Sequence, residues 1–231
     1  MALLGNGAMV FWHDVSAGSD ADYQDWHAHE HLAERVGIPG FQRGRRYVAV
    51  DGAPRYFIMY EVDALAVLTS ADYLARLNDP TPWTTRALGH FRNSNRTLCQ
   101  VAASHGLGLG GLLLTLQLAP APGRGDDLDA WLTGGVLAAL AGRSGLNAAH
   151  LLKGDEAASQ TETAEKKLRD RPDAVADRVV LVEGYDEAAL AAVRDGDLSP
   201  AALRDAGVAG SPQVALYRLL NSVSTADLGT A

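Results

Sequence analysis

Cysteine is almost missing from this sequence, which has one, Cys99, in 231 residues. A single thiol cannot form a disulfide within the chain, so the sequence predicts a protein of a reducing compartment, and we expect it in the cytoplasm. The first residues lack a basic segment followed by a long apolar one, so no signal peptide is expected. No apolar run approaches the roughly 18 residues of a spanning helix, so we expect no membrane partner.

Positive charge is also scarce, because 20 Lys and Arg stand against 28 Asp and Glu and give a formal net charge of −8. Binding to phosphate backbones requires clustered positive potential, so we expect no nucleic-acid partner. The one dense basic group is Arg43, Arg45 and Arg46. It suits a small anionic ligand or acidic neighbours, and a small molecule is the expected partner.

The apolar and turn patterns of the first half predict the order β-α-β-β-α-β, which is the ferredoxin-like plan. Strands are expected at 9–15, 41–50, 56–62 and 96–101, and helical regions at 21–36 and 63–78. Turn residues at 37–40 and 51–54 separate these elements. The Pro-rich stretch 79–83 is expected to break the second helical region.

The second half repeats this order. Strands are expected at 112–118, 146–153, 179–183 and 214–220, and helices at 126–140 and 187–193. Trp26 aligns with Trp131 and Gly37 with Gly142 without a gap, whereas Glu61 aligns with Glu183 only if about 17 extra residues are allowed. Those residues, near 156–173, are polar and predict an extended or mobile connection.

The sequence therefore predicts an α+β protein of two tandem ferredoxin-like βαββαβ repeats, residues 1–105 with the candidate site and a degenerate repeat at 106–231. The glycine-rich stretch 106–111 joins them. It is interpreted as a linker, because no Lys-Ser/Thr follows it and a strand comes next, unlike in a phosphate loop.

The segment His29-Glu30-His31-Leu32-Ala33-Glu34-Arg35, followed by Ile38-Pro39-Gly40-Phe41, resembles the dimeric α+β barrel superfamily, and most closely its EthD-like branch. Ala33 departs from the pattern, since the family often has proline there. The resemblance implies that two four-stranded sheets pair face to face as a barrel, here within one chain, which removes exposed sheet edges. A monomer with an internal pseudo-dimer and a homodimer are both compatible with it.

The resemblance also implies His31 as an acid or base, because it matches the family's recurring histidine. A helical wheel gives a different ranking. It places His29 on the apolar face with Trp26, Leu32 and Val36, so His29 is expected to be the buried histidine and a contact to substrate.

Two further histidines leave alternatives open. His27 and His31 lie one turn apart and could share a metal ion, but no third ligand is evident, so no metal is expected. His13 shares a strand face with Phe11, and it is either a pocket residue or a satisfied core histidine.

Strand two places Arg43, Arg45 and Tyr47 on one face, where they could bind a carboxylate or phenolate. Ion pairing with Glu30, Glu34 or Asp51 is the alternative for the arginines. Tyr60 could donate to an enolate or pack in the barrel, and Trp83 could cap a pocket. Val136 stands where His31 would repeat, so the site is expected in the first half.

The leading hypothesis is a cofactor-independent isomerase, cyclase or lyase acting on a small aromatic or polyketide-like organic acid. His31 or His13 transfers the proton, and Tyr60 or an arginine holds the oxygen. The superfamily also has cofactor-free and haem-binding branches, so a cofactor-free or haem-dependent monooxygenase is the second hypothesis. A non-catalytic small-molecule-binding barrel is the third.

Overall fold

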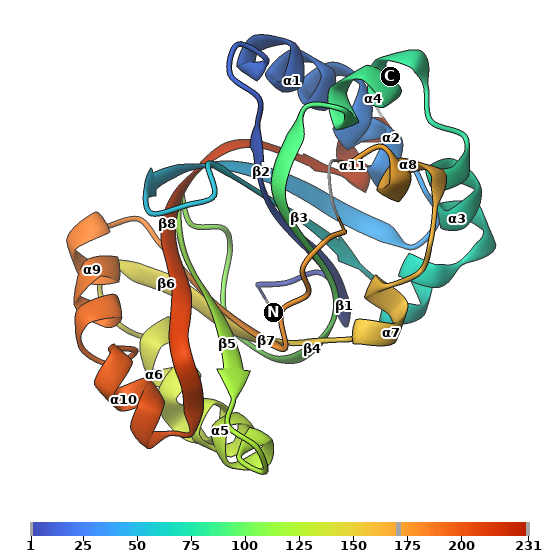
Figure 1. Cartoon of the computed structure of the whole chain (residues 1–231). Coiled ribbons are helices and arrows are strands. Elements are labelled where there is room, and N and C mark those ends of the chain that lie inside the picture. The colour runs from blue at the N-terminus through green and yellow to red at the C-terminus, as the bar shows by residue number, and fades with distance from the viewer. Residues whose placement is uncertain (1, 170–171, 230–231) are drawn as a thin grey trace.

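The strands of the computed structural model, which describes residues 2–169 and 172–229, close into one antiparallel barrel (Figure 1). The order around it is β1 (Gly7–Val15), β3 (Tyr56–Val62), β2 (Phe41–Asp51), β8 (Val208–Ser224), β5 (Leu112–Pro120), β7 (Arg178–Gly184), β6 (Leu146–Gly154) and β4 (Phe91–Gly106). Each half contributes four neighbouring strands in the same relative order, and the halves join where β2 pairs with β8 and β4 with β6. The predicted α+β fold, with two ferredoxin-like sheets paired within the chain, is confirmed.

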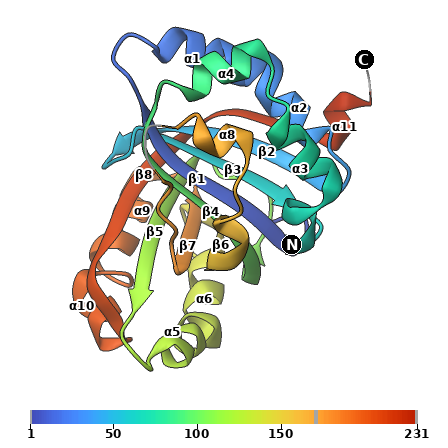
Figure 2. The same ribbon diagram turned by 45° about the vertical axis from the view of Figure 1, so that its right-hand side comes forward.

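Helices cover the outer face of each sheet, so the barrel lies between two helical layers (Figures 1 and 2). The first half carries α1 (Asp20–Trp26), η1 (His27–His31), α2 (Leu32–Val36), η2 (Leu65–Thr69), α3 (Ala71–Asn78) and α4 (Pro82–Leu88). The second half carries α5 (Gly125–Trp131), η3 (Leu132–Val136), α6 (Leu137–Ala141), α7 (Glu156–Ser159), α8 (Ala164–Lys167), α9 (Glu187–Asp195), α10 (Pro200–Asp205) and α11 (Thr225–Leu228). Within the described residues, no helix has the length and apolarity needed to cross a bilayer.

Alternation along the strands creates three apolar cores. Trp12, Tyr47 and Phe57 belong to a core shared by strands of both halves, which fills the barrel interior. Phe11 and Tyr60 belong to a second core, between the first sheet and its helices. The third core lies between the second sheet and its helices and consists mainly of Leu and Val.

The predicted break at 79–83 is present, because α3 ends at Asn78, but a helix that was not expected, α4, begins inside it at Pro82. The Thr81 side chain accepts a hydrogen bond from the Thr84 amide, and Pro82 occupies the first helical turn. Proline is well tolerated there because that N–H has no helical partner in any case. The pattern repeats at α10, which Ser199 caps and Pro200 begins, and which the sequence reasoning also missed.

The long polar insertion was expected to be extended or mobile, and its described residues are folded rather than extended. It forms α7 and α8, which leave the second half and lie against the first, as the gold segment of Figures 1 and 2 shows. The Asp155 amide donates to the Leu98 carbonyl, and the Ala164 amide donates to Asn78 Oδ1. Leu168 packs against the core of the first half. Residues 170 and 171 lie outside the described part of the chain.

Gly44 lets the first helix approach its sheet closely. A Cβ atom at this position would lie 2.5 Å from Leu32 Cδ1 and 2.8 Å from Tyr60 Cε1. We expect Gly44→Ala to lower the free energy of unfolding by about 1–3 kcal/mol, because Tyr60 and Leu32 would have to shift in a packed layer. Urea unfolding measures this.

The matched control is Gly111→Ala, since nothing lies within 4 Å of a Cβ built there. Its effect should stay within about 0.5 kcal/mol. Equal effects of the two substitutions would contradict the close approach at Gly44.

Candidate active site

A π-helical turn in the first helix decides which histidines face the sheet. η1 contains one residue more per turn than an α-helix, so it rotates the residues that follow it relative to an ideal wheel. Leu32 and Val36 thereby share a buried face with Trp26, His27 and His31, and His29 is exposed. The expectation that His29 is the buried histidine is wrong, because the wheel assumed an uninterrupted α-helix.

The buried histidines lie in a layer of aromatic rings between helix and sheet. The His13 ring stacks on Phe91, with centroids 4.2 Å apart and planes 3° from parallel. His13 also contacts Tyr23, whose ring centroid lies 5.9 Å from that of His27. His27 in turn lies 5.6 Å from His31. These contacts make a continuous path of titratable rings from strand β1 to the end of η1.

Several polar atoms in this layer have no hydrogen-bond partner within the described residues. They are both ring nitrogens of His13 and of His27, Nδ1 of His31, and the hydroxyls of Tyr23 and Tyr60. A buried polar atom without a partner costs about 1–3 kcal/mol, so proteins rarely keep a cluster of them without a role. Such a cluster is typical of a site that receives water or a ligand.

Burial sets the protonation states of these groups. It lowers the pKa of His13 to about 3, with help from the positive charges of Arg169 and Arg46. Burial also lowers the pKa of His27 and of His31 well below the usual range, and nearby arginines lower both further. The three imidazoles are therefore neutral near pH 7 and able to accept a proton. Burial raises the pKa of the Tyr60 hydroxyl, which stays protonated.

A small enclosed cavity lies at the His31 end of this layer, where α2, α3 and β4 meet the insertion. The volume open to the centre of a water molecule is about 20 Å³, which is room for about one water. Its lining combines apolar side chains with one histidine, two tyrosines, three arginines and one glutamate: Met9, Phe11, His31, Arg35, Ile58, Tyr60, Tyr73, Leu77, Leu88, Phe91, Arg96, Glu165 and Arg169.

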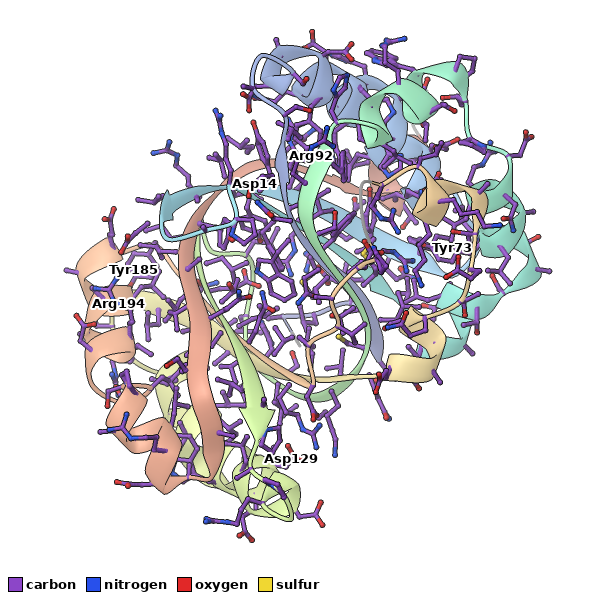
Figure 3. The ribbon with its side chains drawn as sticks, in the orientation of Figure 1. Asp14, Tyr73, Arg92, Asp129, Tyr185 and Arg194 are labelled. Atoms are coloured by element: carbon purple, nitrogen blue, oxygen red, sulfur yellow. The ribbon has the colours of Figure 1, made fainter. Side chains whose placement is uncertain are left out.

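The charged side chains of the cavity come from both halves of the chain. Arg35, on α2, forms a buried ion pair with Glu165, on α8. Arg96, on β4, donates to the Tyr73 hydroxyl at 2.9 Å. Tyr73, labelled in Figure 3, extends from α3, which contacts α8. Arg169 is bound by Asp173 at 2.6 Å and lies 5.4 Å from the Phe11 ring centroid.

Sequence reasoning missed Arg35, Arg96, Glu165 and Arg169. Arg35 had a signal, because it ends the His-Glu-His-Leu-Ala-Glu-Arg segment that carries the resemblance. Glu165 and Arg169 had none, because nothing local indicates that the insertion folds over the other half.

The predicted binding residues of strand two lie elsewhere. Arg45 and Tyr47 point into the barrel, where Arg45 bonds Glu61 at 2.9 Å, Glu183 at 2.8 Å and the Tyr47 hydroxyl at 2.9 Å. Arg43 pairs with the same Glu61 at 2.8 Å. Glu30, Glu34 and Asp51 were the expected acidic partners for this group, and they are not the ones used here.

His150 completes this interior cluster, with Nε2 3.5 Å from Glu183. His150 aligns with Arg45, and Glu183 aligns with Glu61, so corresponding positions of the two halves meet inside the barrel. Arg45 lowers the pKa of the Glu183 carboxyl to about 2, against the opposing effect of burial, and keeps it charged. The cluster is internally compensated, and its side chains do not line the His31 cavity.

Trp83 also differs from its expected place, and Arg46 lies on the opposite face of its strand from Arg45. The Trp83 indole donates to Asp22 Oδ1 at 3.0 Å and anchors α4 to α1, outside the cavity lining. Arg46 instead faces the histidine layer. Its guanidinium donates to the Gln24 carbonyl at 2.8 Å and lies 5.9 Å from the Tyr23 ring centroid.

A larger, open pocket of about 390 Å³ lies at the end of the barrel near the β2–β3 turn, the region of Asp14 and Arg92 in Figure 3. Trp12, Asn95 and Gln117 contribute to its wall. The Asn95 amide already donates to Gln117 at 2.7 Å. We place the candidate site at the smaller cavity, because that is where a neutral histidine, a protonated tyrosine and arginines converge.

Neither a metal ion nor a haem fits the histidine layer well. Among the described residues, no group of three His, Cys, Asp or Glu side chains is placed to hold a metal ion. A haem needs an axial ligand beside a flat slot, whereas His13 is stacked on Phe91 and the cavity beside His31 has room for about one water. We therefore derive no step through either group.

Comparison with known proteins gives the fold. No family model matches the sequence, and no curated protein sequence matches it. Among solved structures, an anthrone oxidase-like protein covers 97% of this chain and 95% of its own, with a TM-score of 0.64 and 16% identity. A Fusobacterium nucleatum protein provisionally assigned as a monooxygenase covers 96% of both chains, with a TM-score of 0.58 and 9% identity.

A protein provisionally assigned as a chlorite dismutase is also similar, with a TM-score of 0.57, 13% identity, and coverage of 94% of this chain and 96% of its own. These similarities define the class of architecture, a ferredoxin-like α+β barrel. At such low identities they show the fold alone.

The neutral state of His13 predicts a pH dependence of stability. The pKa of His13 is about 6.5 in the unfolded chain and about 3 in the fold, so between these values the unfolded state binds the additional proton. The free energy of unfolding should therefore fall as the pH is lowered below about 6.5, by up to about 1.4 kcal/mol per pH unit from this group.

His13→Phe should remove that contribution and leave a shallower slope, since His27 and His31 contribute in the same direction. Urea unfolding at about pH 7, 6 and 5 measures both slopes. An unchanged slope in the variant would mean that His13 is not held neutral by the fold.

Arg45 predicts a large effect on stability. Arg45→Met leaves Glu61 and Glu183 without their shared partner inside the barrel, so we expect a loss of about 3–5 kcal/mol in urea unfolding. The control is Arg143→Met, which breaks a half-exposed pair with Asp197 and should cost no more than about 1 kcal/mol. A small effect at Arg45 would argue against its structural role.

Proposed function

We propose that this protein is an enzyme that removes a proton from a small aromatic or polyketide-like organic acid, with His31 as the base. The observation that carries the proposal is the convergence, at one enclosed cavity, of a neutral buried histidine, an unpartnered tyrosine hydroxyl and arginines. Proton transfer of this kind needs no cofactor.

His31 suits the role of base for two reasons. Its imidazole is neutral near pH 7 because burial and Arg35 lower its pKa, so it has a free lone pair. Its Nδ1 lies 3.8 Å from Glu34 Oε2, which stabilises the imidazolium once the proton has arrived. Returning the proton to a different carbon gives isomerisation, and attack of the carbanion on a carbonyl of the same molecule gives cyclisation.

Tyr60 and the arginines suit the role of stabilising the anion. The Tyr60 hydroxyl is protonated and unpartnered, so it can donate a hydrogen bond to an enolate oxygen. Arg35, which adds to burial in lowering the pKa of His31, also lowers the pKa of a substrate in the same cavity.

A substrate must enter from the side that the insertion closes. The cavity has room for about one water, and Glu165 and Arg169 form part of its wall. Movement of residues 160–168 opens the cavity without unfolding the barrel, because these residues, which include α8, lie outside the strand pairing. Closure over the substrate then excludes water from the reaction.

The test uses 1,8-dihydroxyanthrone, an acidic polyketide-like carbon acid, in deuterated buffer without oxygen. The wild type should accelerate exchange of the ring CH₂ protons for deuterium, followed by NMR. We expect His31→Ala to lower the enzymatic rate by about 10²–10⁴-fold and Tyr60→Phe to lower it less, since the phenol assists while the base is required.

The matched control is His29→Ala, which removes an exposed histidine from the same helical turn and should keep the wild-type rate. Equal rates for His31→Ala and His29→Ala would exclude His31 as the base.

Oxygen transfer to the same carbanion is the second candidate. It is favoured by the anthrone oxidase-like protein, which matches this fold along 97% of the chain. An anthrone and O₂ give an anthraquinone and water: one oxygen atom becomes the new carbonyl, and the other leaves with both hydrogens of the CH₂ group. The first step is the proton abstraction already assigned to His31.

Oxygen uptake separates the two candidates. With 1,8-dihydroxyanthrone in air, an oxygenase should consume one O₂ per quinone formed, and His31→Ala should abolish both. If the protein catalyses deuterium exchange but consumes no oxygen above the uncatalysed rate, the oxygenase hypothesis is rejected and isomerase or cyclase chemistry is retained. A Soret band in the purified protein would instead indicate the haem-dependent branch, against the fit described above.

A further inference from the structure

Three arginines from three different elements converge on the His31 cavity. Arg35 comes from α2, Arg96 from β4, and Arg169 follows α8. All three are buried in a wall that is otherwise largely apolar. Burying several cations together is unfavourable unless an anion accompanies them, so the cavity is built for negative charge.

Their partners among the described residues include one neutral group. Asp173 binds Arg169 through two hydrogen bonds, of 2.8 and 2.6 Å. Arg96 donates to a neutral group, the Tyr73 hydroxyl. Arg35 has one nitrogen, Nη1, without a hydrogen-bond partner within the described residues, although Nη1 lies 3.7 Å from Glu34.

Glu165 supplies the anion in this arrangement. Its carboxylate accepts a hydrogen bond from Arg35 and is attracted by the positive charges of Arg169 and Arg96. The side chain is nearly completely buried. Glu165 belongs to the extra residues of the second half, not to the barrel. Burial raises the pKa of this carboxyl despite the arginines beside it.

We propose that Arg35, Arg96 and Arg169 form an anion subsite, and that Glu165 occupies it in place of the carboxylate or phenolate of an aromatic ligand. An arriving ligand anion displaces Glu165 and moves residues 160–168 away from the cavity, while the pair with Asp173 keeps Arg169 in the subsite. The apolar wall, which includes Phe11, Ile58 and Leu88, receives the ring system. This inference rests on the proposed function for the location of the site, but it is tested by binding alone.

The segment is built for such displacement. α7 and α8 have four residues each, so few backbone hydrogen bonds hold them. The first residues of the segment are fixed to Leu98 by two hydrogen bonds. The Asp155 amide donates to the Leu98 carbonyl, and the Ser159 hydroxyl accepts from the Leu98 amide. Beyond Ser159, the contacts to the first half include the Ala164 bond to Asn78, the packing of Leu168 and the Glu165 ion pair.

The experiment measures binding of 1-hydroxy-2-naphthoate and of its neutral relative 1-naphthol by calorimetry. Glu165→Gln keeps the shape of the side chain and removes the competing charge, so we expect it to tighten binding of the naphthoate tenfold or more. Binding of 1-naphthol should change less than threefold. Arg35→Met should weaken naphthoate binding at least tenfold.

The matched control is Glu162→Gln, which removes an exposed carboxylate from the same segment and should leave both affinities unchanged. If Glu162→Gln tightened naphthoate binding as much as Glu165→Gln does, the change in affinity would come from the general charge of the segment, and the proposal would be overturned. Unchanged naphthoate binding in Glu165→Gln would also overturn it.

Hydrogen exchange of the wild type tests the displacement without any substitution. Ligands usually protect amides, whereas here naphthoate should speed exchange at 167 and 168, whose amides bond within the moving part of the segment. Protection of these amides by naphthoate would overturn the displacement.

Two results would separate the anion subsite from the proposed catalysis. If Glu165→Gln tightens naphthoate binding but the protein does not catalyse deuterium exchange of the anthrone, the subsite is retained and the proposed catalysis is rejected. Deuterium exchange that needs His31, with naphthoate binding indifferent to Glu165, would do the reverse.

Discussion

The pairing of β2 with β8 and of β4 with β6 is the constraint on which the rest of the structure depends. Because the two sheets close on each other, their inner faces fill one apolar core, and the charges that remain inside must compensate one another. Arg45 does this between Glu61 and Glu183. With the interior filled in this way, the enclosed cavity that combines acid-base groups with charge lies on the outer side of a sheet, under its helices. In the first half that layer carries histidines and tyrosines, whereas the described core of the second layer is mainly Leu and Val.

The candidate site belongs to both halves even though its histidines belong to one. His31 and Arg35 come from the first helix, and Glu165 and Arg169 come from an insertion in the second half. The two similar sheets thus form the barrel, and the insertion, which only the second half has, closes the cavity of the first half. This division explains how the second half could lose the histidine position, now Val136, and still contribute to the site.

Strand alternation, turn residues and the repeated order of elements predict the α+β barrel from the sequence, because these signals are local and appear twice. The site is less predictable. The resemblance points to His31, whereas a helical wheel alone points to His29. The wheel fails because a single π-turn rotates every later residue around the helix, and the composition does not indicate that such a turn is present. The prediction that Arg45 and Tyr47 share one strand face is correct. Which face of the sheet becomes the barrel interior is decided only when the two sheets close on each other, so local sequence patterns do not predict it. Glu165 is beyond local reasoning, because its partner Arg35 is 130 positions away.

We propose that a ligand enters the layer beside His31. The most direct test is NMR of the histidine rings and of the Asn and Gln side-chain amides during titration with 1,8-dihydroxyanthrone under nitrogen. The ring signals of His31 and His27 should shift in proportion to bound ligand, while those of exposed His29 should not. Shifts confined to the amides of Asn95 and Gln117, at the open pocket of the barrel end, would contradict the proposal.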